Sequence, residues 1–291
     1  MKTNIVLFVA FVMLICAACQ KDFTVDEALS PSRTTTDSSL LKIYIELDTI
    51  GGIDTLLKIT YDYDSQSRLI SSKAKGYTDS FFTNRYYTYN GNDTLVNKLL
   101  EIYYSTSQTN IFYDSAFTYF TRNSNNKITK DSSIIFHINQ GTISSSKLVS
   151  DFTYFSADSI QRVIKEYNPS PTIVQEFVYK QVINGSNIIK ETEYGFDFLL
   201  NTFYINRVAD FTYDNKFNPF YSEKINYPIY LNINNISDFF TSKHNILTQN
   251  VSGFAQNTNY TYNIFGLPLI SITSYPGSSS EVNKGIFIYG N

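Results

Sequence analysis

The residues that could perform chemistry are few in this sequence, and they lie far apart. The chain has two histidines, His137 and His244, and its two cysteines, Cys16 and Cys19, both stand near the N-terminus. A zinc site needs three or four Cys, His or carboxylate ligands, and the sequence has neither a close pair of histidines nor an HExxH motif. A structural role is therefore favoured for each histidine, and the sequence predicts no metal ligand.

Other short motifs give equally little support for catalysis. Asp62 and Asp64 could suggest Ca²⁺, but the EF-hand pattern is missing and such residues commonly begin turns. The run from Ser144 to Lys147 fits Ser-x-x-Lys, yet the partner motifs of the penicillin-recognising enzymes are missing. Because no Gly-x-Ser-x-Gly elbow or Walker A loop occurs, we predict no catalytic residue, no cofactor and no enzyme activity.

Aromatic side chains are the remaining candidates for a binding surface. The chain has 24 Tyr and 23 Phe but no Trp. Exposed rings can stack on sugars or pack against a protein partner, although cross-strand packing within a sheet also uses Tyr and is the favoured interpretation. The candidates for ligand stacking are Tyr86, Tyr87, Tyr103, Tyr104, Tyr227 and Tyr230.

A short aromatic pattern recurs along the chain: an aromatic residue or Ile, then Thr or Val, then Tyr. Its seven copies are Ile59-Thr60-Tyr61, Tyr87-Thr88-Tyr89, Phe117-Thr118-Tyr119, Phe152-Thr153-Tyr154, Phe177-Val178-Tyr179, Phe211-Thr212-Tyr213 and Tyr260-Thr261-Tyr262. They recur at a loose period of roughly 30 residues, which is typical of stacked supersecondary units.

Each unit is expected to be a β-hairpin. Tyr119 ends one apolar segment, a polar turn follows at residues 122–126, and an alternating segment returns from Lys127 to Phe136. Repeated along the chain, this pattern predicts roughly 14 to 17 strands in one antiparallel meander. A sheet of that size twists and curls. We therefore predict an all-β fold, strongly curved into an open roll or half-barrel, with at most one short helix, at residues 235–243.

One turn region supports a family resemblance. The segment Tyr63-Asp64-Ser65-Gln66-Ser67-Arg68-Leu69 resembles the YD repeat, Tyr-Asp-x-x-Gly-Arg-Leu, with Ser67 in place of the usual Gly. Residues 262–268 keep the Tyr and the turn Gly, and residues 213–220 are similar to a segment of uncharacterised Bacteroidota outer-membrane lipoproteins with degenerate YD-like hairpins. The resemblance spans residues 40–291. It implies a rolled sheet of hairpins and no catalytic residues.

The first residues follow the order of a bacterial secretion signal. Lys2 precedes an apolar run from Ile5 to Ile15, and small residues then lead to Cys19 and a polar segment. This order resembles a lipoprotein signal, whose cleavage leaves the cysteine as the acylated first residue, so Cys19 is the predicted lipidation site. An ordinary secreted protein is the alternative.

Three segments follow from these patterns. Residues 1–18 are the predicted signal peptide, and residues 19–39 are a lipidated, Ser/Thr/Asp-rich flexible tether. Residues 40–291 are expected to form a single YD-repeat-like β domain. Lys21-Asp22 resembles the export signal of Bacteroidota lipoproteins. The predicted location is therefore the outer membrane, with the cell surface favoured over the periplasmic face.

These observations lead to one principal functional hypothesis. We expect a noncatalytic lipoprotein that is held to the membrane by the lipid on Cys19 and acts as a binding or scaffold module at the bacterial outer membrane. An outer-membrane protein or a glycan is the expected partner. The chain has 23 basic and 26 acidic residues, a net charge of -3 and no dense basic run, which argues against nucleic-acid binding.

Three alternatives remain open. A lipid or lipopeptide carrier would line the concave face of the sheet with Phe, Leu and Ile. A glycan-processing enzyme of a surface uptake system would need two carboxylates facing each other in a cleft. A transmembrane barrel would suit the strand number and the aromatic content, but it needs no acyl tether and commonly ends in an aromatic residue, unlike Asn291.

Overall fold

The structure is a computed structural model of the whole chain. It describes residues 40–49, 54–76, 81–93, 95–106, 111–139, 142–156, 158–167, 173–184, 187–220, 242–277 and 281–290. The chain divides into two units, Met1–Thr36 and Asp37–Asn291, and every described residue belongs to the second unit. Cys19, the tether, Tyr227, Tyr230 and nearly all of the predicted helix lie outside the described residues. Within the described ranges, no helix is long and apolar enough to cross a membrane.

The described residues of the second unit form 16 antiparallel strands, a number within the predicted range. They are β1 (Leu41–Asp48), β2 (Asp54–Tyr63), β3 (Leu69–Gly76), β4 (Phe81–Tyr89), β5 (Val96–Thr106), β6 (Ile111–Arg122), β7 (Ile128–Asn139), β8 (Thr142–Ser156), β9 (Ser159–Tyr167), β10 (Ile173–Asn184), β11 (Asn187–Asp197), β12 (Thr202–Phe217), β13 (His244–Val251), β14 (Phe254–Tyr262), β15 (Pro268–Ser274) and β16 (Glu281–Tyr289). Each strand pairs with the next in the chain, so the predicted meander of hairpins is confirmed.

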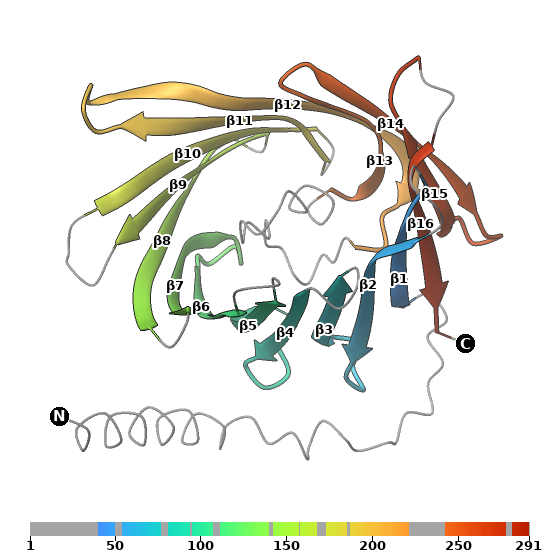
Figure 1. Cartoon of the computed structure of the whole chain (residues 1–291), viewed down its shortest axis with the longest axis horizontal. Helices are drawn as coiled ribbons and strands as arrows, with labels where there is room; N and C mark the ends of the chain where they lie inside the picture. The colour runs from blue at the N-terminus through green and yellow to red at the C-terminus, as the bar shows by residue number, and fades with distance from the viewer. Residues whose placement is uncertain are drawn as a thin grey trace. The chain divides into compact units, whose positions relative to one another are not determined.

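The sheet closes into a full barrel, and the predicted open roll or half-barrel is therefore wrong (Figure 1). β1 pairs with β16 in a register that runs from Leu41 opposite Tyr289 to Asp48 opposite Asn283. Closure gives the backbone N–H and C=O groups of the first and last strands their partners and leaves no sheet edge. The hairpin pattern predicts curvature, but it contains no local signal for pairing between the two ends of the chain.

One type of turn recurs between the strands. An Asp or Asn side chain accepts hydrogen bonds, through Oδ1, from the backbone N–H groups two and four residues later. The residue three positions later has a positive φ, the region that favours Gly. The capping residues are Asp64, Asn123 and Asn263, and the positive-φ residues are Ser67 (62°), Asn126 (61°) and Gly266 (76°). The Gly-to-Ser departure from the YD repeat thus falls at the left-handed position.

Tyrosines near the ends of alternate strands bind neighbouring strands together. Each donates a hydrogen bond from its hydroxyl to a backbone carbonyl at the start of the preceding strand. The pairs are Tyr63 with Leu41, Tyr89 with Leu69, Tyr154 with Ile128, Tyr213 with Ile188 and Tyr289 with Pro268. A half-buried ring with a bonded hydroxyl supplies both packing area and a polar anchor. This role accounts for three tyrosines of the sequence repeat.

Apolar packing occurs on the lumenal side of the wall. The largest cluster comprises Leu41, Leu57, Ile59, Tyr61, Ala74 and Phe287. After β12 the chain turns into the lumen, where the Phe220 ring lies 5.2 Å from Tyr44 and 5.7 Å from Phe287, measured between ring centroids. The barrel is therefore partly filled by its own side chains.

Candidate functional site

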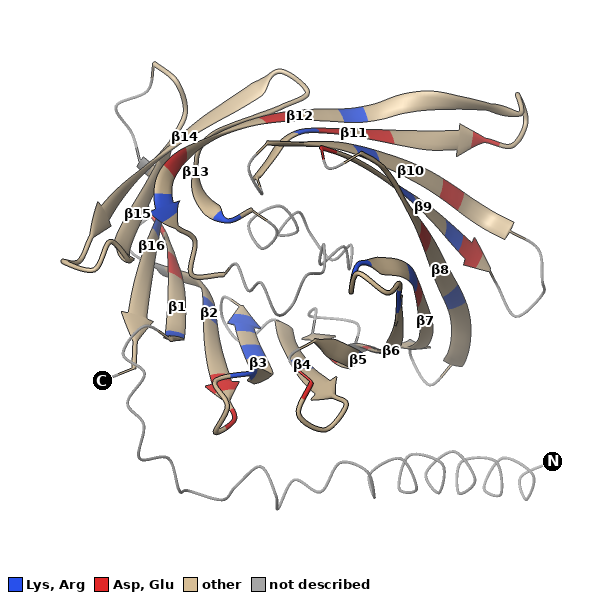
Figure 2. Ribbon diagram, turned by 180° about the vertical axis from the view of Figure 1, so that it is seen from behind, with Lys and Arg blue, Asp and Glu red and all other residues tan. Residues whose placement is uncertain are grey.

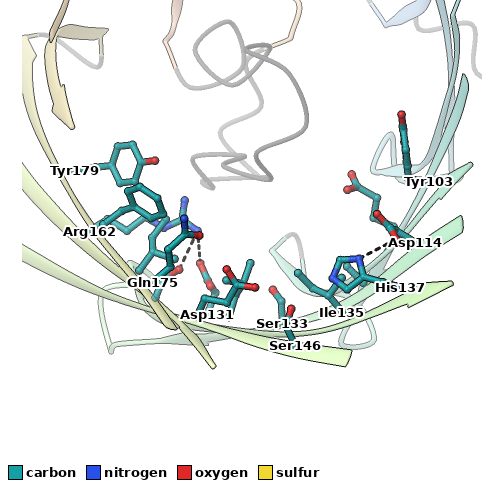
Figure 3. Close-up of a pocket in the computed structure, with 17 residues that line it drawn as sticks. Tyr103, Asp114, Asp131, Ser133, Ile135, His137, Ser146, Arg162, Gln175 and Tyr179 are labelled. Carbon is teal, nitrogen blue, oxygen red and sulfur yellow. Dashed lines mark hydrogen bonds and ion pairs between the residues drawn. The ribbon is translucent and has the colours of Figure 1, made fainter. Parts of the chain in front are cut away.

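A cavity of about 270 Å³ lies in the lumen against β5 to β10 (Figure 3). Because side chains alternate across a strand, every second residue of these strands points into it. The residues that line it are Glu101, Tyr103, Asp114, Ala116, Asp131, Ser133, Ile135, His137, Ser146, Leu148, Ser150, Arg162, Ile164, Glu166, Gln175, Phe177 and Tyr179. The cavity therefore combines aromatic and aliphatic surface with charged and hydroxyl groups.

A buried ion pair forms part of the cavity floor. Arg162 Nη2 lies 3.1 Å from Asp131 Oδ2, and the two side chains are 6% and 2% exposed. The same nitrogen donates to Ser150 Oγ at 2.9 Å, and the guanidinium lies 5.2 Å from the centroid of the Phe152 ring. A planar guanidinium suits such a site because it can bond two acceptors and stack on a ring at once.

A second polar pair lies toward the other side of the floor. His137 Nδ1 and Asp114 Oδ1 are 2.9 Å apart, so this bond occupies one nitrogen of the imidazole and one oxygen of the carboxylate. Between the two pairs lies Ser146, whose hydroxyl is buried without a hydrogen-bond partner among the described residues. Buried hydroxyls normally have a hydrogen-bond partner, so we expect the Ser146 hydroxyl to bond to a water or a ligand.

One further lining residue has a fixed protonation state. Burial, reinforced by the nearby Glu193 and Glu191 carboxylates, raises the pKa of Tyr179 far above neutrality, so its phenol remains a neutral hydrogen-bond donor. Another lining residue, Glu101, is bonded to Arg85, which also points inward. Burial opposes the charge of this guanidinium, but Glu101 together with Tyr87 and Tyr61 raises the pKa of Arg85. Arg85 therefore keeps its charge.

A second cavity, of about 290 Å³, lies against β1, β2, β13 to β16 and the residues that follow β12. Its lining includes Tyr44, Glu46 and Phe220. Glu46 accepts a hydrogen bond from Asn283 Nδ2 at 2.8 Å, and burial raises the pKa of this carboxyl. Most of the polar groups of this cavity are neutral, whereas the first cavity has the larger number of charged groups.

The structure brings one of the tyrosines predicted for ligand stacking into the first cavity. Tyr103 lines it, whereas Tyr104, the next residue, lies on the outer wall with its ring 6.2 Å from that of Phe82. Tyr86 also faces outward, since it alternates with inward Arg85 and Tyr87, and Tyr87 is buried in a core cluster. Cross-strand packing, the interpretation favoured from the sequence, therefore applies to Tyr104, which is paired with Phe82 on the neighbouring strand.

Sequence reasoning missed most of the residues that define the cavity. His137 was assigned a structural role, yet it lines the cavity, whereas His244 bonds to Asn187 away from it. Arg162 and Asp131 belong to no sequence motif, and Ser146 lies inside the Ser-x-x-Lys run, which gave no support for a site. Their only sequence signal is the alternation of each strand, which places them on one face but does not say which face is inside. Among the described residues, no group of three His, Cys, Asp or Glu side chains could hold a metal ion.

Charged residues occur on strands around the barrel (Figure 2). Lysines on outward positions alternate with residues that line the lumen or its core. They are Lys58, Lys73, Lys75, Lys98, Lys130, Lys147, Lys165, Lys180, Lys190 and Lys284. Four of them form cross-strand ion pairs: Lys73 with Asp62, Lys130 with Asp151, Lys165 with Glu176 and Lys190 with Asp210.

Comparison with known proteins shows what this architecture is similar to. The sequence matches no protein-family model and no curated protein. Among solved structures, the chain is similar to a porin-like protein from Bacteroides vulgatus ATCC 8482, with a TM-score of 0.50 and 10% identity over 88% of this chain and 99% of that chain. A porin-like protein from Bacteroides uniformis ATCC 8492 gives a TM-score of 0.43 and 12% identity over 89% of this chain and 100% of that chain.

The first of these likenesses shows the barrel fold. Neither the YD-repeat resemblance nor the lipid anchor is tested by these comparisons, so both stay predictions.

Proposed function

We propose that this protein is a noncatalytic binding module whose barrel stands in water and is tied to the bacterial outer membrane by a lipid on Cys19. The charge of the outer wall carries this proposal. A transmembrane barrel presents an apolar band about 25 Å tall to the lipid. Here lysines occupy the middle of outward faces, as Lys58 does in β2 and Lys147 in β8.

Apolar residues on the outer wall are interrupted by these lysines. Lys58, Lys75 and Lys147 are paired across neighbouring strands with Ile45, Phe82 and Ile134. A lysine on the lipid face of a barrel costs about 2–4 kcal/mol at the bilayer midplane, so several of them would oppose insertion strongly. An aqueous barrel avoids that cost, and an acyl chain on Cys19 then provides the membrane attachment.

The lumen supports binding in preference to the other activities considered. The first cavity contains four carboxylates, one guanidinium and one imidazole, which makes it a poor site for an acyl chain because burying charge against hydrocarbon is unfavourable. Three of the carboxylates, Glu101, Asp114 and Asp131, already bond to Arg85, His137 and Arg162. These bonds argue against an acid and base pair for glycan cleavage, and they favour a site that holds its ligand unchanged.

Fractionation of cells tests the anchor and the aqueous barrel together. Three forms are compared: the natural chain, a Cys16→Ala control, and a form whose residues 1–19 are replaced by a secretion leader that is cleaved without lipidation. We expect the first two forms in the outer-membrane fraction, with lipid on Cys19 detected by mass spectrometry. The third form should fold as a soluble β protein without detergent.

Two results would contradict the proposal in different ways. If the lipid-free form still required detergent for extraction, the barrel would be embedded in the membrane. If the natural chain had no lipid on Cys19, the anchor would be wrong even if the barrel were soluble.

A further inference from the structure

We propose that the cavity lined by β5 to β10 binds the ring of a neutral sugar. This inference rests on the proposed function as a binding module and names the class of its ligand. The cavity volume of about 270 Å³ lies near the lower end of the range of small-molecule sites, about 300–1,000 Å³. It therefore admits one small ligand or the end of a longer one.

Aromatic rings stand on two opposing sides of the cavity. Figure 3 shows Tyr179 at one side and Tyr103 at the other, with the polar floor between them. A pyranose ring has apolar C–H faces and polar hydroxyls around its edge, so it can place one face against an aromatic ring such as Tyr103 while its edge meets polar groups. Tyr rings also offer a hydroxyl at the rim of such a site.

The floor offers donors and acceptors side by side. Ser146 is 7% exposed, lines the cavity, and its hydroxyl has no partner within the described part of the chain. Nearby, the bond between His137 and Asp114 occupies one nitrogen of the imidazole and one oxygen of the carboxylate. A sugar hydroxyl donates and accepts at once, so adjacent sugar hydroxyls can satisfy a serine, an imidazole and a carboxylate together.

The charges in the cavity select against an anionic ligand. Asp131 is paired with Arg162, and Glu101 is paired with Arg85. Among the described residues that line the cavity, Arg162 is the one guanidinium and it is held by Asp131, whereas Glu166 and Asp114 would repel an anion. A neutral, hydroxyl-rich ligand avoids this repulsion.

Calorimetric titration of the mature lipoprotein in detergent tests this inference. The probes are glucose, galactose, mannose, N-acetylglucosamine and their β-linked dimers, compared with glucose 6-phosphate and glucosamine. We expect at least one neutral sugar to bind at micromolar to millimolar concentration and to exceed both ionic analogues. Ser146→Ala should weaken its binding about 2–10-fold, and Tyr103→Ala should weaken it about tenfold.

Matched controls lie on the same strands. Tyr104→Ala and Ser145→Ala change the adjacent outward residues and should leave affinity unchanged. Thermal unfolding of each variant verifies that the barrel is intact. The inference is overturned if none of the neutral sugars binds, if an ionic analogue binds more tightly, or if the outward variants weaken binding as much as the inward ones. A soluble, lipid-anchored barrel that binds no sugar would leave the proposed function standing and reject only the ligand class.

Discussion

Two ion pairs on opposite faces of β7 differ strongly in how far their charges are buried. Lys130 points outward and pairs with Asp151 at 3.7 Å, and both side chains are about half exposed, at 50% and 58%. Asp131, the next residue, points inward and pairs with Arg162 at 3.1 Å, with both side chains almost fully buried. Consecutive residues of one strand therefore experience water on one side and a low-dielectric interior on the other.

β11 repeats the arrangement, which indicates a general rule for this barrel. Outside, Lys190 pairs with Asp210, and inside, Glu191 pairs with Arg207. Lysine is strongly hydrated and suits an exposed wall, whereas the guanidinium fork can bond several acceptors in a confined space. Arg207 illustrates this use of the fork, since it contacts both Glu191 and Glu193. The outward pairs thus adjust solubility, and the inward pairs fix the positions of strands and of cavity residues.

Breaking an inward pair should have the largest effect. Arg162→Met leaves the Asp131 carboxylate buried without its guanidinium, and removing one member of a buried pair destabilises by about 3–5 kcal/mol. At about 2–4 °C per kcal/mol for a domain of this size, the Tm should fall by roughly 10 °C. Thermal and urea unfolding of the lipid-free barrel would measure both quantities.

A double variant distinguishes the cost of the unpaired Asp131 charge from the cost of the packing lost with the Arg162 side chain. Asp131→Asn combined with Arg162→Met removes both charges, and it should recover more than half of the loss. If the double variant were as unstable as Arg162→Met alone, packing of the guanidinium on Phe152 would be the dominant contribution, and the contrast between the two faces would not be electrostatic.

Glu46 extends the comparison between the wall and the lumen to an inward carboxyl that has no cationic partner. It faces the lumen and forms no ion pair with a described lysine or arginine. Burial raises its pKa in the folded state, so folding favours the protonated form. The associated stability is complete below the unfolded pKa and is lost as pH rises through the folded pKa. Glu46→Gln should therefore raise the free energy of unfolding at pH 7, by less than the change at Arg162.

The pH dependence provides the control for this variant. The gain from Glu46→Gln should vanish in urea titrations at pH values below the ordinary range of a Glu carboxyl, because Glu46 is then protonated in both states. A variant that is less stable than the natural chain at pH 7 would mean that the charged form of Glu46 is favoured by its surroundings.

Local signals made the hairpins predictable. Asp64 and Asn263 cap turns whose sequence pattern is readable in a few residues, and the tyrosine repeat marks strand ends. Closure was not predictable in this way, because the register between β1 and β16 joins residues at opposite ends of the domain. Only the summed twist and shear of all the strands decide whether such ends meet.

The cavity was hidden for a related reason. Lys130 and Asp131 are neighbours of opposite charge, and the sequence does not show that one meets water and the other the lumen. The distinction arises from Arg162, which lies two strands away and brings its guanidinium to Asp131. Alternation fixes two sets of residues in each strand, but the choice of the inner set depends on the whole barrel.

The smallest effect should come from the outward pair, and its sign tests the aqueous wall directly. In water, Lys130→Ala should destabilise the barrel by less than about 1 kcal/mol, since exposed ion pairs contribute little, and added salt should shrink even this difference. In lipid, removing the same lysine would instead stabilise the barrel, by up to about 2–4 kcal/mol at the midplane and by less toward the interfaces, and salt would have little influence. Unfolding of the natural chain and of Lys130→Ala, each at low and high salt, distinguishes these cases. A stabilising, salt-independent effect would mean that the outer wall contacts hydrocarbon, and the interpretation of β7 as a strand with one face in water would be wrong.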